Sequence, residues 1–259
     1  MRKLLLVLFF LPFFACKPET ENPAPKPDKY LIKYMSYPIN FFMGPEPLVT
    51  LSYNAKGLVS KRQGGFIQIN PNTGFSSIFR AELYEEISYK GHEISIIQKD
   101  PEITFANEPK RIFLNSWGRI AKIIRHDPMN TNHPYDTTQF FYAGHKLLYT
   151  EHKDRSISTT KHFIFDAVGN LQKTETLSFD HYLQDTIYTE TETFGNYDQA
   201  ANPLKNLAIF EEIFLRSLSN HNFRSYTRHR KNRYGFVYQS AEQSWTFNYD
   251  ENGNAIFYE

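Results

Sequence analysis

The chain is nearly devoid of cysteine, since Cys16 is the single one among 259 residues. This scarcity excludes a framework of intrachain disulfides, and it excludes a zinc site built on paired cysteine ligands. The folded part must therefore be held together by the packing of its side chains.

The sequence also lacks a hydrophobic run that is long enough to span a membrane as a helix. The apolar run at residues 4–15 follows Arg2 and Lys3, whereas a membrane-spanning helix needs about 20 apolar residues. A positive start followed by a short apolar stretch is typical of a secretory signal peptide. We assign residues 1–15 to such a peptide and leave them out of the fold.

The position of Cys16, directly after Ala15 at the end of the apolar run, resembles the lipobox of bacterial lipoproteins. In those proteins the cysteine thiol is acylated and the cysteine becomes the new N-terminus. Phe13 and Phe14 depart from the usual leucine and small residue. The alternative is an ordinary signal peptide that contains a cysteine, but a lone thiol is unusual in an exported protein. We expect lipid attachment at Cys16, and Lys17 after it implies, by the same resemblance, the outer membrane of a Gram-negative cell.

An excess of charge of one sign is absent as well. Arg2 and Lys3 belong to the predicted signal peptide. Without them the chain has 27 basic and 28 acidic residues, and this near-neutral balance does not indicate nucleic-acid binding. The membrane is expected as a partner only through the N-terminal lipid. Residues 16–29 are rich in proline and predict an extended tether, which leaves residues 30–259 as a single β-rich domain.

The chain is rich in aromatic residues, at 16%, and it repeats one pattern at 49–61, 110–122, 161–173 and 245–257. Each copy has alternating apolar residues, then Asn or Asp, two variable residues and Gly. Asx first and Gly fourth are typical of a type I turn that closes a β-hairpin. The predicted turn residues are Asn54 and Gly57, Asn115 and Gly118, Asp166 and Gly169, and Asp250 and Gly253.

Two shorter segments, 87–96 and 140–149, share Tyr-x-Gly-His between alternating stretches and predict two further hairpins. With the stretches between them, the pattern indicates about ten to fourteen strands, mostly antiparallel. The predicted fold is all-β: an antiparallel meander of hairpins that forms a curved open sheet or a barrel-like half-barrel.

One segment departs from the β pattern and predicts an α-helix at about residues 203–218. Asn202 and Pro203 are typical of a helix start. Leu207, Phe210 and Phe214 recur at helical spacing, followed by Leu218, so they lie on one face. We expect this helix to cover one face of the sheet.

The hairpin phrase Tyr/Phe-Asp-x-x-Gly-Asn resembles the YD repeat of Rhs-type proteins. The whole arrangement is similar to a group of Bacteroidetes-type lipoproteins of unknown function. The shared motifs occur here in order as Tyr197-Asp198, Asn202-Pro203, Leu218-Ser219-Asn220 with Asn222, and Tyr249-Asp250 to Gly253. The resemblance covers most of residues 30–259 and implies a porin-like curved antiparallel sheet at the cell envelope. It implies no mechanism.

No catalytic or metal-binding pattern is visible in the sequence. The nine histidines form no His-x-x-x-His motif, and no Gly-x-Ser-x-Gly elbow occurs. Asp166 and Asp250 are explained by turn capping. We therefore predict no cofactor, no metal and no enzymatic activity.

Two features are candidates for binding. Arg224, Arg228 and Arg230 alternate within the basic segment 223–234 and, on a strand, share a face that suits phosphates or acidic glycans. The favoured alternative pairs this face with Glu190 and Glu192 on a neighbouring strand.

The second feature is Trp117, which lies inside a predicted turn and has a ring that suits stacking on a sugar or packing on a strand. The leading hypothesis is a non-enzymatic envelope protein that binds a ligand, such as a glycan, or an envelope protein. A structural or accessory role in an envelope assembly is the second, and a glycan-active enzyme the third.

Overall fold

The structure is a computed structural model that describes residues 34–36, 48–68, 77–102, 109–126, 135–154 and 156–257. One compact unit spans Leu31–Glu259. Cys16, the signal peptide at 1–15 and the tether at 16–29 lie outside the described residues, so their assignments stay predictions.

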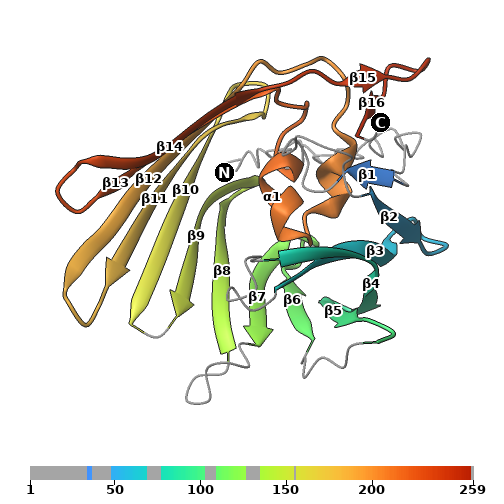
Figure 1. Cartoon of the computed structure of the whole chain (residues 1–259), viewed down its shortest axis with the longest axis horizontal. Coiled ribbons are helices and arrows are strands. Elements are labelled where there is room, and N and C mark those ends of the chain that lie inside the picture. Colours follow the sequence, from blue (N-terminus) through green and yellow to red (C-terminus); the bar gives the residue numbers. More distant parts are fainter. Residues whose placement is uncertain are drawn as a thin grey trace, which may run out of the picture. The chain divides into compact units, whose positions relative to one another are not determined.

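The described chain is dominated by a fourteen-stranded sheet in which every strand pairs with its neighbours in the sequence (Figure 1). The strands are β1 (Tyr34–Ser36), β2 (Leu48–Tyr53), β3 (Val59–Gln68), β4 (Ser77–Lys90), β5 (Glu93–Lys99), β6 (Lys110–Leu114), β7 (Ile120–His126), β8 (Tyr135–Ala143), β9 (Lys146–Asp154), β10 (Ile157–Phe165), β11 (Leu171–Asp180), β12 (Asp185–Gly195), β13 (Ser225–Asn232) and β14 (Val237–Ser244). A separate pair, β15 (Asn248–Tyr249) and β16 (Ala255–Ile256), follows. Within the described residues β1 and β14 do not pair, so the meander is open. The all-β antiparallel prediction is confirmed.

Each repeated Asx-x-x-Gly segment forms a hairpin turn, in which the Asx side chain caps the backbone and the glycine adopts a positive φ. In the first turn the Oδ1 atom of Asn54 accepts hydrogen bonds from the backbone N–H groups of Lys56 and Leu58, at 2.9 and 3.1 Å. Gly57 has a φ of 72°, a conformation that costs glycine little. The same bonds recur at Asn115, Asp166 and Asp250.

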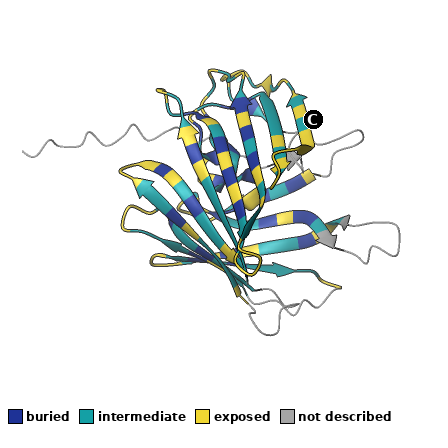
Figure 2. Ribbon diagram, turned by 90° about the vertical axis from the view of Figure 1, so that its left-hand side faces the viewer, coloured by how far each residue is buried: buried dark blue, intermediate teal, exposed yellow. Residues whose placement is uncertain are grey.

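Alternation along the strands separates a buried face from an exposed one, visible as bands in Figure 2. Ile94 of β5, Ile112 of β6 and Ile123 of β7 lie opposite one another in the ladder, and all three are buried. Because paired residues project to the same side of a sheet, this row forms part of the core.

The segment predicted as one helix at 203–218 is broken into a 3-10 helix, η2 (Pro203–Leu207), and an α-helix, α1 (Glu211–Ser217). Phe210 is extended, with φ −97° and ψ 125°. Ile209 and Phe210 are both buried, although consecutive residues of a helix point about 100° apart. The break lets both side chains enter the core.

The sheet curves around α1, as Figure 1 shows. Lys110 of β6 donates to the backbone oxygen of Ile209 at 3.2 Å, just before the helix. The ring of Phe214 lies 5.5 Å from that of Phe140 on β8 and 6.3 Å from that of Phe163 on β10. The segment from Ile209 to Phe214 thus contacts strands from β6 to β10 on the side toward which the sheet curves. The prediction that the helix covers one face of the sheet is confirmed.

The motifs that carried the family resemblance tie the helical segment to the sheet. Asn202 donates to the backbone oxygens of Arg216 and Ser219 at 2.7 and 2.9 Å. Ser219 Oγ in turn accepts from the backbone N–H of Leu171 on β11 at 2.9 Å. These residues therefore have structural roles.

Candidate functional site: a polar pocket between α1 and strands β3 to β6

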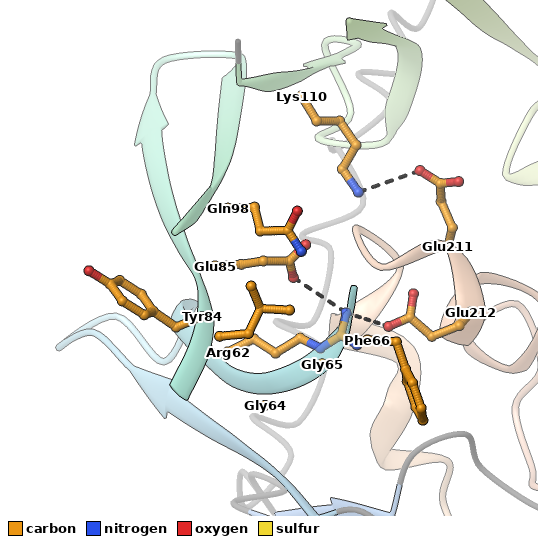
Figure 3. Close-up of a pocket in the computed structure, with 11 residues that line it drawn as sticks. Arg62, Gly64, Gly65, Phe66, Tyr84, Glu85, Gln98, Lys110, Glu211 and Glu212 are labelled. Atoms are coloured by element: carbon orange, nitrogen blue, oxygen red, sulfur yellow. Dashed lines mark hydrogen bonds and ion pairs between the residues drawn. The ribbon is translucent and has the colours of Figure 1, made fainter. Parts of the chain in front are cut away.

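A pocket of about 380 Å³ lies between the start of α1 and strands β3, β4, β5 and β6 (Figure 3). Its volume is in the range of small-molecule sites, which is roughly 300–1,000 Å³. Its charged and amide side chains are Arg62, Glu85, Gln98, Lys110, Glu211 and Glu212.

The floor of the pocket depends on two consecutive glycines in β3. The register shifts between Gln63 and Gly65, and Gly64 has a φ of 91°. A Cβ atom at Gly64 would lie 3.0 Å from the backbone oxygen of Leu48, and one at Gly65 would lie 3.0 Å from Cδ2 of Leu83. Both contacts are tight. At Gly64 the neighbour is backbone and φ is positive, so a side chain there is strained, whereas at Gly65 the Leu83 side chain would have to shift by a few tenths of an ångström.

Arg62 is the central cation of the pocket and is only 7% exposed. The ladder places it opposite Glu85, whose carboxylate lies 3.3 Å away. Its guanidinium also pairs with Glu212 at the start of α1 and lies 5.1 Å from the ring centre of Phe210. This paired arginine links the sheet to the helix, and removal of either partner would leave charge poorly compensated.

Glu211 faces a second set of cations. Lys110 Nζ lies 3.5 Å and Arg125 Nε 2.8 Å from its Oε1 atom. Burial acts to raise the pKa of Glu211, but the charges of Lys110 and Arg125 hold this pKa below its ordinary value. The carboxylate is therefore ionised at neutral pH and is a poor proton donor.

The described lining consists of arginine, lysine, glutamate, glutamine, glycine, leucine and aromatic residues, without serine, threonine, cysteine or histidine. In the part of the chain that the structure describes, no group of three or more His, Cys, Asp or Glu residues is arranged to hold a metal ion. Gln98, beside Glu85 in the ladder, offers both a donor and an acceptor to a polar ligand.

The basic face predicted on strand 223–234 is largely neutralised by its neighbour. β12 pairs with β13, and Glu190 lies opposite Arg230. The Oε2 atom of Glu190 is 2.7 Å from Arg230 Nη2 and 4.0 Å from Arg228 Nε. This face is therefore engaged in ion pairs, as the alternative interpretation predicted. Arg230 is the closer partner of Glu190 because the two residues lie directly opposite each other on β12 and β13.

Glu192, two residues further along β12, is held by a mixed network. Its carboxylate accepts from Lys161 Nζ, Thr174 Oγ1 and Tyr226 Oη, each at 2.8 Å. Burial acts to raise the pKa of Glu192, but Lys161 and these hydrogen bonds keep it below its ordinary value.

The remaining predicted binding residues lie apart from the pocket. Arg224 donates to the backbone oxygen of Asn196 at 2.9 Å and lines a separate hollow of about 520 Å³ with Asp198 and Tyr249. Trp117 is 63% exposed in the β6–β7 turn, with its ring centre 6.3 Å from that of His145. The structure thus does not gather Arg224, Arg228, Arg230 and Trp117 into one site.

Sequence reasoning missed the pocket residues, although one signal was visible. Consecutive glycines within an alternating stretch indicate a bulge or a close backbone approach, which is the case at Gly64 and Gly65. A further Asx-x-x-Gly turn was also missed, at Asn232 to Gly235. There Asn232 Oδ1 accepts from the backbone N–H groups of Tyr234 and Phe236 at 3.0 and 3.1 Å.

Comparisons with known proteins show similarity of fold. A crystal structure of a porin-like protein from Bacteroides vulgatus matches with a TM-score of 0.55 and 11% identity, covering 88% of this chain and 90% of the other. A porin-like protein from Bacteroides uniformis has a TM-score of 0.48 and 13% identity, covering 81% and 79%. No family model and no curated protein matches the sequence. The porin-like sheet implied by the sequence resemblance is thus confirmed at the level of fold by the first of these structures.

Proposed function

We propose that this chain is a cell-envelope protein, anchored by a lipid on Cys16, that binds a small polar ligand in the pocket beside Arg62 without transforming it. The short apolar run and the single cysteine at its end support export and anchoring. The porin-like fold shared with a Bacteroides protein is compatible with an envelope location. Among the described residues, no helix has the length and apolar character to cross a membrane.

The observation that carries the binding proposal is a pocket of ligand size, about 380 Å³, whose charged side chains are held in place by ion pairs. Arg62 is paired with Glu85 and Glu212, and Glu211 is paired with Lys110. A preformed set of fixed charges and amide groups binds a polar molecule with little reorganisation. The lowered pKa of Glu211 keeps its carboxylate ionised at neutral pH, which favours binding over acid catalysis by this group.

The test starts from the unlipidated chain, made with Cys16→Ser, which is screened on a glycan array and used to capture small molecules and proteins from an envelope extract. Bound molecules are identified by mass spectrometry. The variant Gln98→Trp fills the pocket from β5, and Gln243→Trp on β14 is the same change outside the pocket. We expect the captured ligand to be lost with Gln98→Trp and kept with Gln243→Trp.

Two results would contradict this proposal: capture that is unaffected by Gln98→Trp in a variant that still folds, or turnover of the captured molecule. Capture of proteins alone, again insensitive to the pocket change, would favour the accessory role in an envelope assembly.

Anchoring has its own measurement. Wild-type chain in a Gram-negative host should incorporate a clickable palmitate analogue, and Cys16→Ser should abolish the label. Labelling that persists in Cys16→Ser would show that the lipid is attached elsewhere.

A further inference from the structure

Two adjacent hairpin tips carry a cluster of exposed apolar side chains that the pocket does not explain. The β11–β12 turn exposes Tyr182 and Leu183, and the β13–β14 turn exposes Tyr234 and Phe236, followed by Val237 and Tyr238. We call these six residues the tip patch. Tyr182 is 86% exposed and Phe236 is 69% exposed. Apolar side chains gathered in this way mark an interaction surface.

The two tips form one surface because they are bridged. Arg233 Nη1 donates to Asp185 Oδ2 at 3.0 Å, which joins the β13–β14 turn to the start of β12. The backbone at Tyr234 is fixed by the Asn232 turn cap, and Tyr182 is fixed by a bond from its N–H to Asp180 Oδ1 at 2.8 Å. The aromatic side chains are therefore presented on ordered turns.

The composition of the tip patch favours a lipid bilayer as its occupant. Tyrosine and phenylalanine are suited to the membrane interface, where the ring is buried among lipid and the phenol hydroxyl stays hydrated. The charges of Arg233 and Asp185 are paired with each other, so apolar burial dominates over attraction to anionic lipid. In Figure 1 the β11–β12 and β13–β14 turns point away from α1, and such projecting tips can enter an interface without a complementary protein groove.

The predicted tether also limits how far the domain can stand from a membrane. At roughly 3.1 Å per residue in an extended proline-rich chain, residues 16–29 reach about 43 Å. A lipid on Cys16 would therefore hold the domain at high local concentration next to the bilayer.

We propose that the tip patch is a second membrane contact, which inserts its aromatic side chains into the interfacial layer of a lipid bilayer. This inference rests on the envelope location in the proposed function. It does not depend on the lipid anchor or on the identity of the pocket ligand.

The experiment uses the chain from residue 16 with Cys16→Ser, which lacks both the apolar run of the signal peptide and the lipid, so that binding reports the tip patch, with vesicles of phosphatidylcholine or of phosphatidylcholine and phosphatidylglycerol. We expect cosedimentation with both, persisting in about 0.5 M NaCl, where ionic attraction is screened. The double variant Tyr234→Ser with Phe236→Ser should bind at least about tenfold more weakly, because each ring loses more than about 1 kcal/mol of burial. The matched double variant Trp117→Ser with Val168→Ser, in the β6–β7 and β10–β11 turns at the opposite ends of the strands, should bind as the parent does.

A depth measurement gives an independent readout. Tryptophan introduced by Tyr234→Trp should be quenched by brominated lipids, whereas tryptophan introduced by Val168→Trp, at the equivalent turn position, should not. The native tryptophans are common to both variants.

Failure of the parent to cosediment with either vesicle, or equal quenching at positions 168 and 234, would overturn the proposal. Loss of a crosslinked envelope protein on changing Tyr234 and Phe236, without any vesicle binding, would overturn it in favour of a protein interface. Persistent palmitate labelling of Cys16→Ser would refute the anchor and leave the vesicle result standing.

Discussion

The buried side chain of Asn202 is expected to hold the helical segment on the sheet. Its amide donates to the backbone oxygens of Arg216 and Ser219 at 2.7 and 2.9 Å. Its Oδ1 atom accepts from the backbone N–H of Leu204 at 3.0 Å, at the start of η2. One side chain thus satisfies backbone groups at both ends of the segment, and no other residue type has donors and an acceptor in this short fork.

The substitution Asn202→Ala removes three hydrogen bonds. At about 1 kcal/mol each, with the stranded backbone groups buried, the free energy of unfolding should fall by about 3 kcal/mol. Asn202→Asp keeps the acceptor for Leu204 but places a carboxylate against two carbonyl oxygens. It should cost at least as much as Asn202→Ala at neutral pH. The repulsion raises the pKa of the new acid, so Asn202→Asp should recover part of its stability as the pH falls toward that pKa.

Urea unfolding followed by far-ultraviolet circular dichroism and by tryptophan fluorescence measures this loss. Trp245 lies 4.9 Å from the guanidinium of Arg216, so its emission also reports local release of the helix. Coincident transitions would justify a two-state free energy. Asn252→Ala, in the exposed β15–β16 turn, is the control and should change stability by less than about 0.5 kcal/mol. A loss below about 1 kcal/mol for Asn202→Ala would refute the reasoning.

Three further predictions concern the sheet. A double-mutant cycle between Glu190 and Arg230, which share a rung, should show favourable coupling of about 1 kcal/mol in urea unfolding, and zero coupling would contradict the ion pair. Gly64→Ala should lower the free energy of unfolding by roughly 1 kcal/mol or more beyond the loss caused by Gly118→Ala. Both glycines have positive φ, but of the two only Gly64 has atoms close to the position of a Cβ. Equal losses would show that the crowding is relieved. The lowered pKa of Glu192 means that its ionised form stabilises the fold above the unfolded pKa of about 4.3, and that this contribution is lost as the pH falls through the lower folded pKa. The difference in unfolding free energy between wild type and Glu192→Gln should therefore shrink between about pH 6 and pH 3, and a constant difference would argue against it.

The sheet could be predicted from the sequence because each hairpin turn is formed by residues that lie next to one another in the chain. Asn54, Asn115, Asp166 and Asp250 each cap a turn with their own side chain, and the alternation beside each turn sets which face is buried. A meander needs no long-range information beyond this, since each strand pairs with the next. The break between η2 and α1 was not predictable in the same way, because it depends on Ile209 and Phe210 both entering a core built by distant strands.

The candidate pocket was not predictable for a related reason. Arg62 lies in an ordinary alternating stretch, and its partner Glu212 is far away in the sequence. Only the curvature of the sheet around α1 brings β3 to the start of the helix. Gly64 and Gly65 were visible as an irregularity, but their meaning depends on the crowding by Leu83 and by the backbone of Leu48.

The residues that build the repeated hairpins differ from those at which we propose binding. The Asn and Asp residues of the repeat cap the turns with their side chains, and the glycines supply the positive φ that the turns need. These structural roles explain why the residues recur. The proposed binding surfaces lie where the repeat is altered: at the double glycine of β3, and at the Asn232 turn, whose variable and following positions hold Tyr234 and Phe236 in exposed positions. In a chain made of nearly equivalent hairpins, a side chain that departs from the repeat and does not stabilise the fold is best explained by selection for binding. The exposed ring of Phe236 is such a departure, because the Asn232 cap and Gly235 alone are sufficient to close that turn.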